Sequence, residues 1–104
     1  PGDASTVNAL VARLGDAHWE VRRAAVQALG SAGRRGDKVS AVAVQGRLAD
    51  EHWAVRQLAL ESLAQIVDRG DAGTRDAVAA CLEDAHYAVR QAAVKALLQV
   101  VEKG

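Results

Sequence analysis

Each of the three histidines in this chain is followed directly by an aromatic residue. The pairs are His18–Trp19, His52–Trp53 and His86–Tyr87. The 104 residues contain no other histidine and no other aromatic side chain. Imidazole nitrogens are common metal ligands, and aromatic rings form cages around cationic ligands. The pairs could therefore form a metal site, a ligand cage or a repeated structural element.

The spacing of the pairs argues against a metal site. Neighbouring pairs lie 34 positions apart, as His18 and His52 do. Equivalent residues on stacked helices are roughly 8–10 Å apart, whereas the ligands of one zinc ion converge to within roughly 3–4 Å of one another. His18, His52 and His86 would form a ladder instead of a cage. We therefore expect no bound metal and no cofactor, and we expect each histidine to act at a helix start, as an N-cap or in the turn.

The same period runs through the whole chain. Residues 3–36, 37–70 and 71–104 each begin with Asp and end with Gly, and they align without a gap. Self-similarity at a fixed period of this length indicates stacked structural repeats. We call these segments repeats 1, 2 and 3, and we expect them to form a single domain over residues 1–104.

The second half of each repeat has the apolar spacing of an amphipathic helix, i, i+3, i+4, i+7, i+8 and i+11. The residues are Val21, Ala24, Ala25, Ala28, Leu29 and Ala32; Val55, Leu58, Ala59, Ser62, Leu63 and Ile66; and Val89, Ala92, Ala93, Ala96, Leu97 and Val100. The first half has a shorter apolar pattern, such as Leu10, Val11 and Leu14. Each repeat is therefore predicted to be two helices joined by a tight turn.

Glycine and aspartate at the repeat boundaries predict where helices end and begin. Gly36 and Gly70 suit the position just past a helix end. Asp37 and Asp71 follow directly and suit the N-cap of the next helix, where a carboxylate accepts from free backbone N–H groups.

A shared motif, Leu-x-Asp-x-x-x-x-Val-Arg-x-x-Ala-x-x-x-Leu, spans the turn and the second helix of every repeat. Its residues are Leu14, Asp16, Val21, Arg22, Ala25 and Leu29; Leu48, Asp50, Val55, Arg56, Ala59 and Leu63; and Leu82, Asp84, Val89, Arg90, Ala93 and Leu97. The motif resembles the HEAT repeat, and more closely the short HEAT-like repeat named after phycobilisome lyases. The tetratricopeptide and ankyrin signatures are missing.

The resemblance implies an all-α fold, an armadillo-like α-solenoid with the first helices on the convex side and the second helices on the concave side. It also implies a polar ladder in the turns that ties neighbouring repeats together. The ladder residues would be Asp16, Arg22, Asp50, Arg56, Asp84 and Arg90. An Arg next to an apolar Val is expected to be partly buried, and a buried Arg needs a carboxylate or carbonyl partner.

Each second helix also carries polar residues and one aromatic at i, i+4 and i+8, away from the apolar positions. These candidate protein-binding residues are Trp19, Arg23, Gln27, Trp53, Gln57, Glu61, Tyr87, Gln91 and Lys95. Aromatic and Arg side chains on an exposed face are typical of interaction hot spots. Alternatively, the three aromatic rings stack on one another and seal the ends of the helical hairpins.

Composition excludes several function classes. Thirteen basic and thirteen acidic side chains balance, which argues against a nucleic-acid binder. No apolar run could span a membrane, and the single cysteine, Cys81, fits a reducing, cytoplasmic environment. No phosphate-binding loop or catalytic triad is recognisable, and Cys81 occupies the position of Arg13 and Arg47, which makes it an inert variant position.

The sequence therefore predicts a non-enzymatic scaffold that binds a protein or peptide on the concave face. Two alternatives stay open. The chain could be a self-assembling module, because apolar residues stand in its terminal repeats: Val7, Leu10 and Val11, and Leu97, Leu98, Val100 and Val101. It could also be a fragment of a larger HEAT-repeat enzyme such as a phycobilin lyase.

Overall fold

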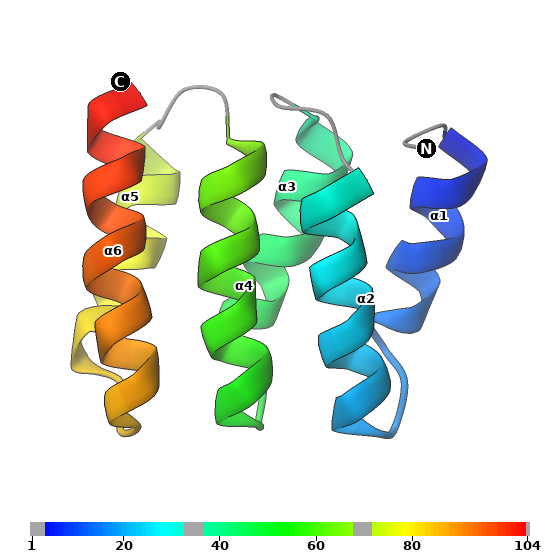
Figure 1. Ribbon diagram of the computed structural model, residues 1–104, viewed down its shortest axis with the longest axis horizontal. Helices are drawn as coiled ribbons and strands as arrows, with labels where there is room; N and C mark the ends of the chain where they lie inside the picture. The colour runs from blue at the N-terminus through cyan, green and yellow to red at the C-terminus, as the bar shows by residue number, and fades with distance from the viewer. Residues whose placement is uncertain (1–3, 33–36, 68–71, 104) are drawn as a thin grey trace.

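The computed structural model describes residues 4–32, 37–67 and 72–103, which form six α-helices in two layers (Figure 1). The first helices of the repeats are α1 (Ala4–Arg13), α3 (Lys38–Gln45) and α5 (Ala72–Ala80), and the second helices are α2 (Trp19–Ala32), α4 (Trp53–Ile66) and α6 (Tyr87–Lys103). Two 3-10 helices, η1 (Gly46–Ala49) and η2 (Cys81–Glu83), extend α3 and α5.

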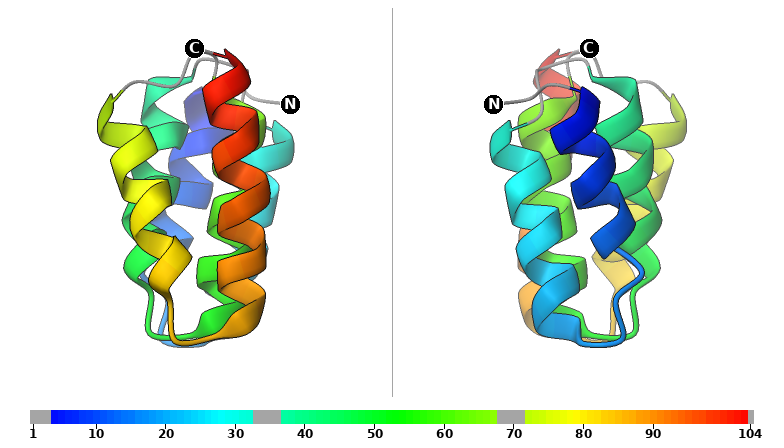
Figure 2. Two further views of the ribbon diagram at one scale, coloured as in Figure 1. Left: turned by 90° about the vertical axis from the view of Figure 1, so that its left-hand side faces the viewer. Right: turned by 90° about the vertical axis from the view of Figure 1, so that its right-hand side faces the viewer.

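The second helices α2, α4 and α6 lie side by side in one layer, and the first helices α1, α3 and α5 form the other layer (Figures 1 and 2). No β-strand occurs in the three described ranges. The predicted all-α solenoid of helical hairpins is therefore confirmed.

Helix α4 lies in the middle of its layer and is buried from both sides. All six of its predicted apolar positions are buried, among them Val55 and Leu63, which are fully inaccessible to solvent. Leu60 and Ala64, which lie outside the predicted stripe, are buried as well. The core is thus shared between repeats, as expected for helices too short to enclose a core of their own.

The predicted stripe is wrong for part of α2. Ala24 is exposed and Val21 is only half-buried, whereas Arg22, Val26 and Gly30 are buried. The physical reason is that α2 has a second-layer neighbour on one side only, α4, among the described residues. The apolar positions that would face a preceding helix are therefore left open.

Helix α6 shows the converse pattern. Its predicted positions Val89, Ala92, Ala93, Ala96 and Val100 are buried against repeat 2, and Leu97 is half-buried. On the side of α6 away from α4, however, Val94 is 51% exposed and Leu98 is 62% exposed. The equivalent residues of α4, Leu60 and Ala64, are buried because α6 covers them. Of the terminal apolar residues, Val7 is buried, and the Val101 side chain lies outside the described part.

The predicted N-cap at Asp37 is confirmed. Its carboxylate accepts hydrogen bonds from the backbone N–H groups of Val39 (3.1 Å) and Ser40 (3.2 Å) and from the Ser40 hydroxyl (2.9 Å). The hydroxyl and backbone donors hold the pKa of Asp37 below its usual value. Gly36, Gly70 and Asp71 lie outside the described residues.

Inside each repeat, the motif aspartate shapes the turn between the two helices. The carboxylate of Asp50 accepts from the backbone N–H of His52 (3.0 Å), and Asp16 and Asp84 accept in the same way from His18 (2.8 Å) and His86 (2.9 Å). This hydrogen bond places the histidine at the start of the second helix. Each turn thereby presents an aspartate, a histidine and an aromatic ring at the same end of the layer.

Candidate functional site

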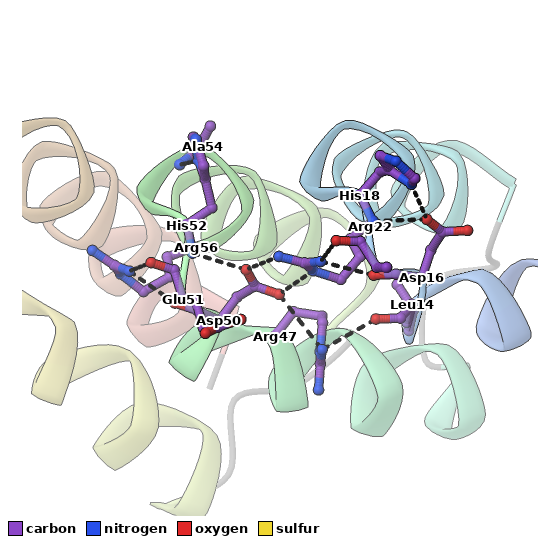
Figure 3. Close-up of polar contacts among 11 residues, drawn as sticks. Leu14, Asp16, His18, Arg22, Arg47, Asp50, Glu51, His52, Ala54 and Arg56 are labelled. Atoms are coloured by element: carbon purple, nitrogen blue, oxygen red, sulfur yellow. Dashed lines mark hydrogen bonds and ion pairs between the residues drawn. The ribbon is translucent and has the colours of Figure 1, made fainter.

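Arg22 connects the turn of repeat 1 to the turn of repeat 2 (Figure 3). Its Nε and Nη2 donate to the two carboxylate oxygens of Asp50, at 2.8 and 3.1 Å. Its Nη1 donates to the backbone carbonyls of Asp16 (2.7 Å) and Ala17 (3.2 Å). The two side chains are largely buried, with 10% of Arg22 and 2% of Asp50 exposed. This bidentate geometry is the strongest arrangement of an Arg–carboxylate pair.

Arg56 repeats the arrangement between repeats 2 and 3. Its Nε and Nη2 donate to Asp84 at 2.8 and 3.0 Å, and its Nη1 donates to the carbonyls of Asp50 (2.8 Å) and Glu51 (3.1 Å). Arg90 holds the carbonyls of its own turn in the same way. Among the described residues, however, no carboxylate pairs with Arg90. Arg22 and Arg56 thus each bind their own turn and the aspartate of the following repeat, whereas Arg90, within the described residues, binds only its own turn.

Charge and burial compete at the ladder aspartates. Burial by itself would raise the pKa of Asp50, but the hydrogen bonds from Arg22 and from the His52 backbone, together with the arginine charge, outweigh it and lower the pKa. The same balance, with Arg56 as the partner, lowers the pKa of Asp84. The hydrogen bond to Asp50 raises the pKa of Arg22. Both aspartates are therefore ionised at neutral pH.

We call the contact region between two neighbouring repeats a joint. Arg47 adds a second contact across the joint between repeats 1 and 2, and the sequence analysis did not predict it. Its Nη1 donates to the backbone carbonyl of Leu14 (3.1 Å) and lies 3.5 Å from Oδ2 of Asp50. The available signal was the arginine at the same position of repeat 1, Arg13. Repeat 3 has Cys81 there, a buried thiol that lies 3.6 Å from the carbonyl of Ala77 on its own helix.

Five of the six histidine and aromatic rings form one continuous ring column across the repeats, in the order Trp19, His52, Trp53, His86 and Tyr87. Trp19 stacks on His52 with ring centroids 3.8 Å apart and planes at 12°, and Trp53 stacks on His86 at 4.1 Å and 8°. Within repeats, His86 and Tyr87 are 5.1 Å apart. The alternative interpretation, in which the three aromatic rings stack on one another, is therefore wrong. Trp19 and Trp53 each stack on the histidine of the following repeat, and Tyr87 lies against His86 of its own repeat.

An N-cap or turn role was predicted for all three histidines, and the side chains of two of them, His52 and His86, cap the second helices. Nδ1 of His52 accepts from the backbone N–H of Ala54 (3.0 Å), and Nδ1 of His86 accepts from that of Ala88 (3.1 Å). The ring of His18 instead lies 3.4 Å from the carboxylate of Asp16, and its side chain is 80% exposed. In the ranges that the structure describes, no three His, Cys, Asp or Glu side chains are grouped so as to hold a metal ion.

Most candidate binding residues lie on the open face of the second-helix layer. We call the nine residues the ridge surface. Trp53 is 38% exposed and Tyr87 is 64% exposed, whereas Trp19 is half-buried. Gln57 is also half-buried and donates to Glu61 (3.3 Å), and the other polar members are exposed: Arg23, Gln27, Glu61, Gln91 and Lys95.

Two shallow hollows lie on this face. One, of about 300 Å³, opens between α2 and α4 and is lined by Trp19, Glu20, Arg23, Trp53, Ala54 and Gln57. The other, of about 290 Å³, lies between α4 and α6 and is lined by Glu61, Ala64, Gln65, Ala92, Lys95, Ala96 and Gln99. Both hollows lie between neighbouring second helices, and small residues, Ala54 in one and Ala64, Ala92 and Ala96 in the other, line them.

No described helix combines the length and apolarity required to cross a membrane. None of the curated proteins matches the chain. The family model of HEAT repeats matches residues 1–64 and again residues 40–103. These two matches together cover residues 1–103, including the Arg–Asp ladder and the ring column. The chain therefore belongs to the family of HEAT repeats.

Proposed function

We propose that this chain is a non-catalytic scaffold that binds a protein or peptide on the ridge surface, the expected concave face of the solenoid. HEAT repeats suggest protein-interaction scaffolds in general. The observation that carries the more specific proposal is the exposure of Trp53 and Tyr87 next to polar side chains and shallow hollows on one face. Aromatic and arginine side chains in such positions are the residue types that dominate interface energetics.

The polar members of the ridge surface suit a polypeptide partner. Gln27, Gln57 and Gln91 carry amide groups that both donate and accept hydrogen bonds, as a peptide backbone requires. Arg23, Glu61 and Lys95 alternate in charge from one second helix to the next. A partner with a complementary order of charges would be selected by this alternation, whereas a nucleic-acid backbone would be repelled by Glu61.

Tyr87 provides the cleanest test, because it separates binding from packing. Trp19 and Trp53 each stack on the histidine of the following repeat, so their loss would also weaken a joint. Tyr87 has no such histidine after it among the described residues and is more exposed than either. Tyr87→Ala should therefore reduce binding and leave the melting temperature nearly unchanged.

The experiment places a photo-cross-linking amino acid at Gln91 on the ridge surface, in cells that make the protein. The matched control places it at Val42, which is 72% exposed on the opposite layer. We expect discrete cross-linked proteins from Gln91 that Tyr87→Ala reduces at least several-fold, and none from Val42. Equal products from both positions, or a partner removed by nuclease, would overturn the proposal.

The buried free thiol of Cys81 supports a reducing, cytoplasmic location for this interaction. The balanced charge of the chain supports a protein partner over a nucleic acid or an anionic membrane. A catalytic role finds no support in the residues of the ridge surface, since their hydrogen bonds and exposure suit contact with a partner.

A further inference from the structure

We propose that copies of this chain associate head to tail, with α6 of one copy packing against α2 of the next. The residues at one end of the stack correspond to one side of the joint between neighbouring repeats, and the residues at the other end correspond to its other side. This association uses the ends of the layers and shares only Tyr87 with the ridge surface. Its tests change Arg90, Asp16, Ala28 and Leu98, which lie outside the ridge surface, so they are independent of the proposed scaffold function. We call the side of α1 and α2 the leading end, and the outer side of α6 the trailing end.

Each end carries one partner of the polar contact that connects neighbouring repeats. At the trailing end, the carbonyls of Asp84 (2.8 Å) and Ala85 (3.1 Å) hold Nη1 of Arg90, as the equivalent carbonyls hold Arg22 and Arg56. The guanidinium is therefore already oriented for the pair that the other two arginines make with the following aspartate. No carboxylate in the described part of the chain occupies that place.

The matching carboxylate stands at the leading end. Oδ1 of Asp16 accepts from the backbone N–H of His18 (2.8 Å), which fixes the turn as in repeats 2 and 3. Its Oδ2 lies 3.8 Å from Arg13, whose side chain is 61% exposed, in an ion pair with little stabilising effect. Asp16 of one copy is thus placed to accept from Arg90 of another, as Asp50 accepts from Arg22.

The ring column is open at the same two places. It ends at Tyr87, which is 64% exposed, and its first ring is Trp19. His18, directly before Trp19, has a side chain that is 80% exposed. In both internal joints, an aromatic ring stacks on the histidine of the following repeat with planes within 12°. Docking of a second copy would stack its His18 on Tyr87 and continue the column.

Apolar residues on the two ends correspond to residues that are buried in α4. At the trailing end, Val94 and Leu98 are 51% and 62% exposed, whereas their equivalents in α4, Leu60 and Ala64, are almost inaccessible. At the leading end, exposed Ala24 is equivalent to Leu58, which is only 8% exposed. Covering these side chains supplies the hydrophobic contribution to association.

The sizes of the facing residues are also complementary. Ala64 shares a hollow with Ala92 and Ala96, so position 98 would face the equivalent alanines of a second copy, Ala24 and Ala28. Leu98 is larger than Ala64 and than Gly30, the equivalent residue of repeat 1. The added volume at Leu98 is balanced by Ala24, which is small where repeat 2 has leucine. A bulky residue at that place would leave no room for Leu98.

The occupant that fits the trailing end is therefore a second copy of this chain. Any occupant of the trailing end must present a carboxylate, an imidazole and a face of small residues with the spacing of one repeat. The leading end of a second copy has all three. Such an interface joins two different surfaces and leaves one free at each end. It therefore generates open chains or closed rings instead of a symmetric dimer.

Sedimentation velocity over micromolar to millimolar protein tests the association. We expect oligomers that grow with concentration in the wild type. Arg90→Glu should raise the dissociation constant by about 30-fold or more, because it places two carboxylates at the joint. Val42→Ala, on the outer layer, is the matched control and should leave association unchanged. A wild type that stays monomeric at millimolar concentration would overturn the proposal.

A charge exchange between the two ends tests the pairing itself. Asp16→Arg alone and Arg90→Asp alone should each impair association, because both create like charges at the joint. An equimolar mixture should assemble again, since every joint in an alternating chain then has one arginine and one aspartate. If both variants retain the wild-type melting curve and the mixture does not assemble, the proposed pairing is wrong.

Cysteine pairing tests the register even if Asp16→Arg fails to fold. Position 28 is equivalent to Ser62, and a Cβ at Gly30 would lie 2.8 Å from that of Ser62. We therefore place single cysteines at Ala28 and at Leu98 in a Cys81→Ala background. On mild oxidation, a mixture of Ala28→Cys and Leu98→Cys chains should form mixed dimers at least several-fold faster than either chain forms its own dimer. Preferential formation of same-variant dimers would overturn the head-to-tail arrangement.

Discussion

The imidazole of His52 lies flat on the indole of Trp19, with ring centroids 3.8 Å apart and ring planes 12° apart. The same imidazole accepts the backbone N–H of Ala54 through Nδ1 (3.0 Å). One side chain of repeat 2 thus starts its own helix and packs on repeat 1. The histidine therefore belongs to the joint between two repeats. It precedes the aromatic residue directly because it caps the helix that this aromatic residue starts.

The two roles of His52 can be separated by substitution. We expect His52→Asn to keep the cap and lose the stack, at a cost of about 0.5–1.5 kcal/mol in the free energy of unfolding. His52→Ala should cost about 1 kcal/mol more, because the cap is lost as well. Urea denaturation measures both values. His18→Ala is the matched control, and a loss as large as that of His52→Ala would contradict a stabilising stack.

Replacement of Asp50 by Asn should destabilise the chain strongly. The amide can still accept from the His52 N–H, but it leaves the buried Arg22 without its carboxylate. We expect a loss of about 3 kcal/mol in the free energy of unfolding, the lower end of the range for a broken buried ion pair. The lower end applies because the pair borders a hollow of about 470 Å³ at the turns.

Asp16→Asn is the control for Asp50→Asn. Asp16 makes the same turn hydrogen bond (2.8 Å) but pairs only loosely with Arg13. Its replacement should leave the melting temperature almost unchanged. Equal losses for the two variants would mean that the turn, instead of the pair between repeats, is responsible.

Acid should destabilise the chain through two of the three ladder aspartates, Asp50 and Asp84. The pKa values of Asp50 and Asp84 are lowered in the folded state, so the unfolded state binds protons more readily. Their contribution to stability is present above the unfolded pKa of about 3.9 and is lost as pH falls through the lower folded values. Thermal melting between neutral pH and pH 2 should show this loss, and Asp50→Asn should show a smaller one.

Gly30 should not tolerate even an alanine. A Cβ there would lie 2.7 Å from Oγ and 2.8 Å from Cβ of Ser62, which is buried and donates to the carbonyl of Val26 (3.1 Å). We expect Gly30→Ala to cost about 1–3 kcal/mol by overpacking. Chemical denaturation measures this cost.

Gly46 supplies the comparison for Gly30. It has a helical backbone in η1, and a Cβ there would meet nothing within 4 Å. Gly46→Ala should therefore be neutral or stabilise the chain by up to about 1 kcal/mol, by restricting the unfolded chain. A similar loss for both variants would show that contact with Ser62 is not the cause.

Cys81 should react slowly with thiol reagents in the folded chain. Burial, and then the charge of Asp84, raise the pKa of the Cys81 thiol, so little thiolate is present at neutral pH. Labelling with a disulfide reagent should be many-fold faster in denaturant than in buffer. Equally fast labelling of the folded chain would contradict the burial of this residue.

The sequence by itself determined the repeated helical hairpins, the family and the polar face of the second helices. These follow from local patterns, namely a 34-residue period, apolar residues at helical spacing, and aspartates before helix starts. In α4 the helical period also identified the buried positions, because neighbouring helices cover both sides. In α2 the same period failed at Ala24, because burial depends on which helices are adjacent.

Only the tertiary structure decided which side chains meet across the joints. Arg22 pairs with Asp50, which lies 28 positions away, although Asp16 is only 6 positions away. Trp19 stacks on His52 and not on the neighbouring His18. These pairings depend on the distance and rotation between stacked repeats, and packing of the buried apolar side chains sets both. The resemblance implied a polar ladder between neighbouring repeats. A motif that occurs three times, however, does not show which aspartate each arginine contacts or which histidine each aromatic ring contacts.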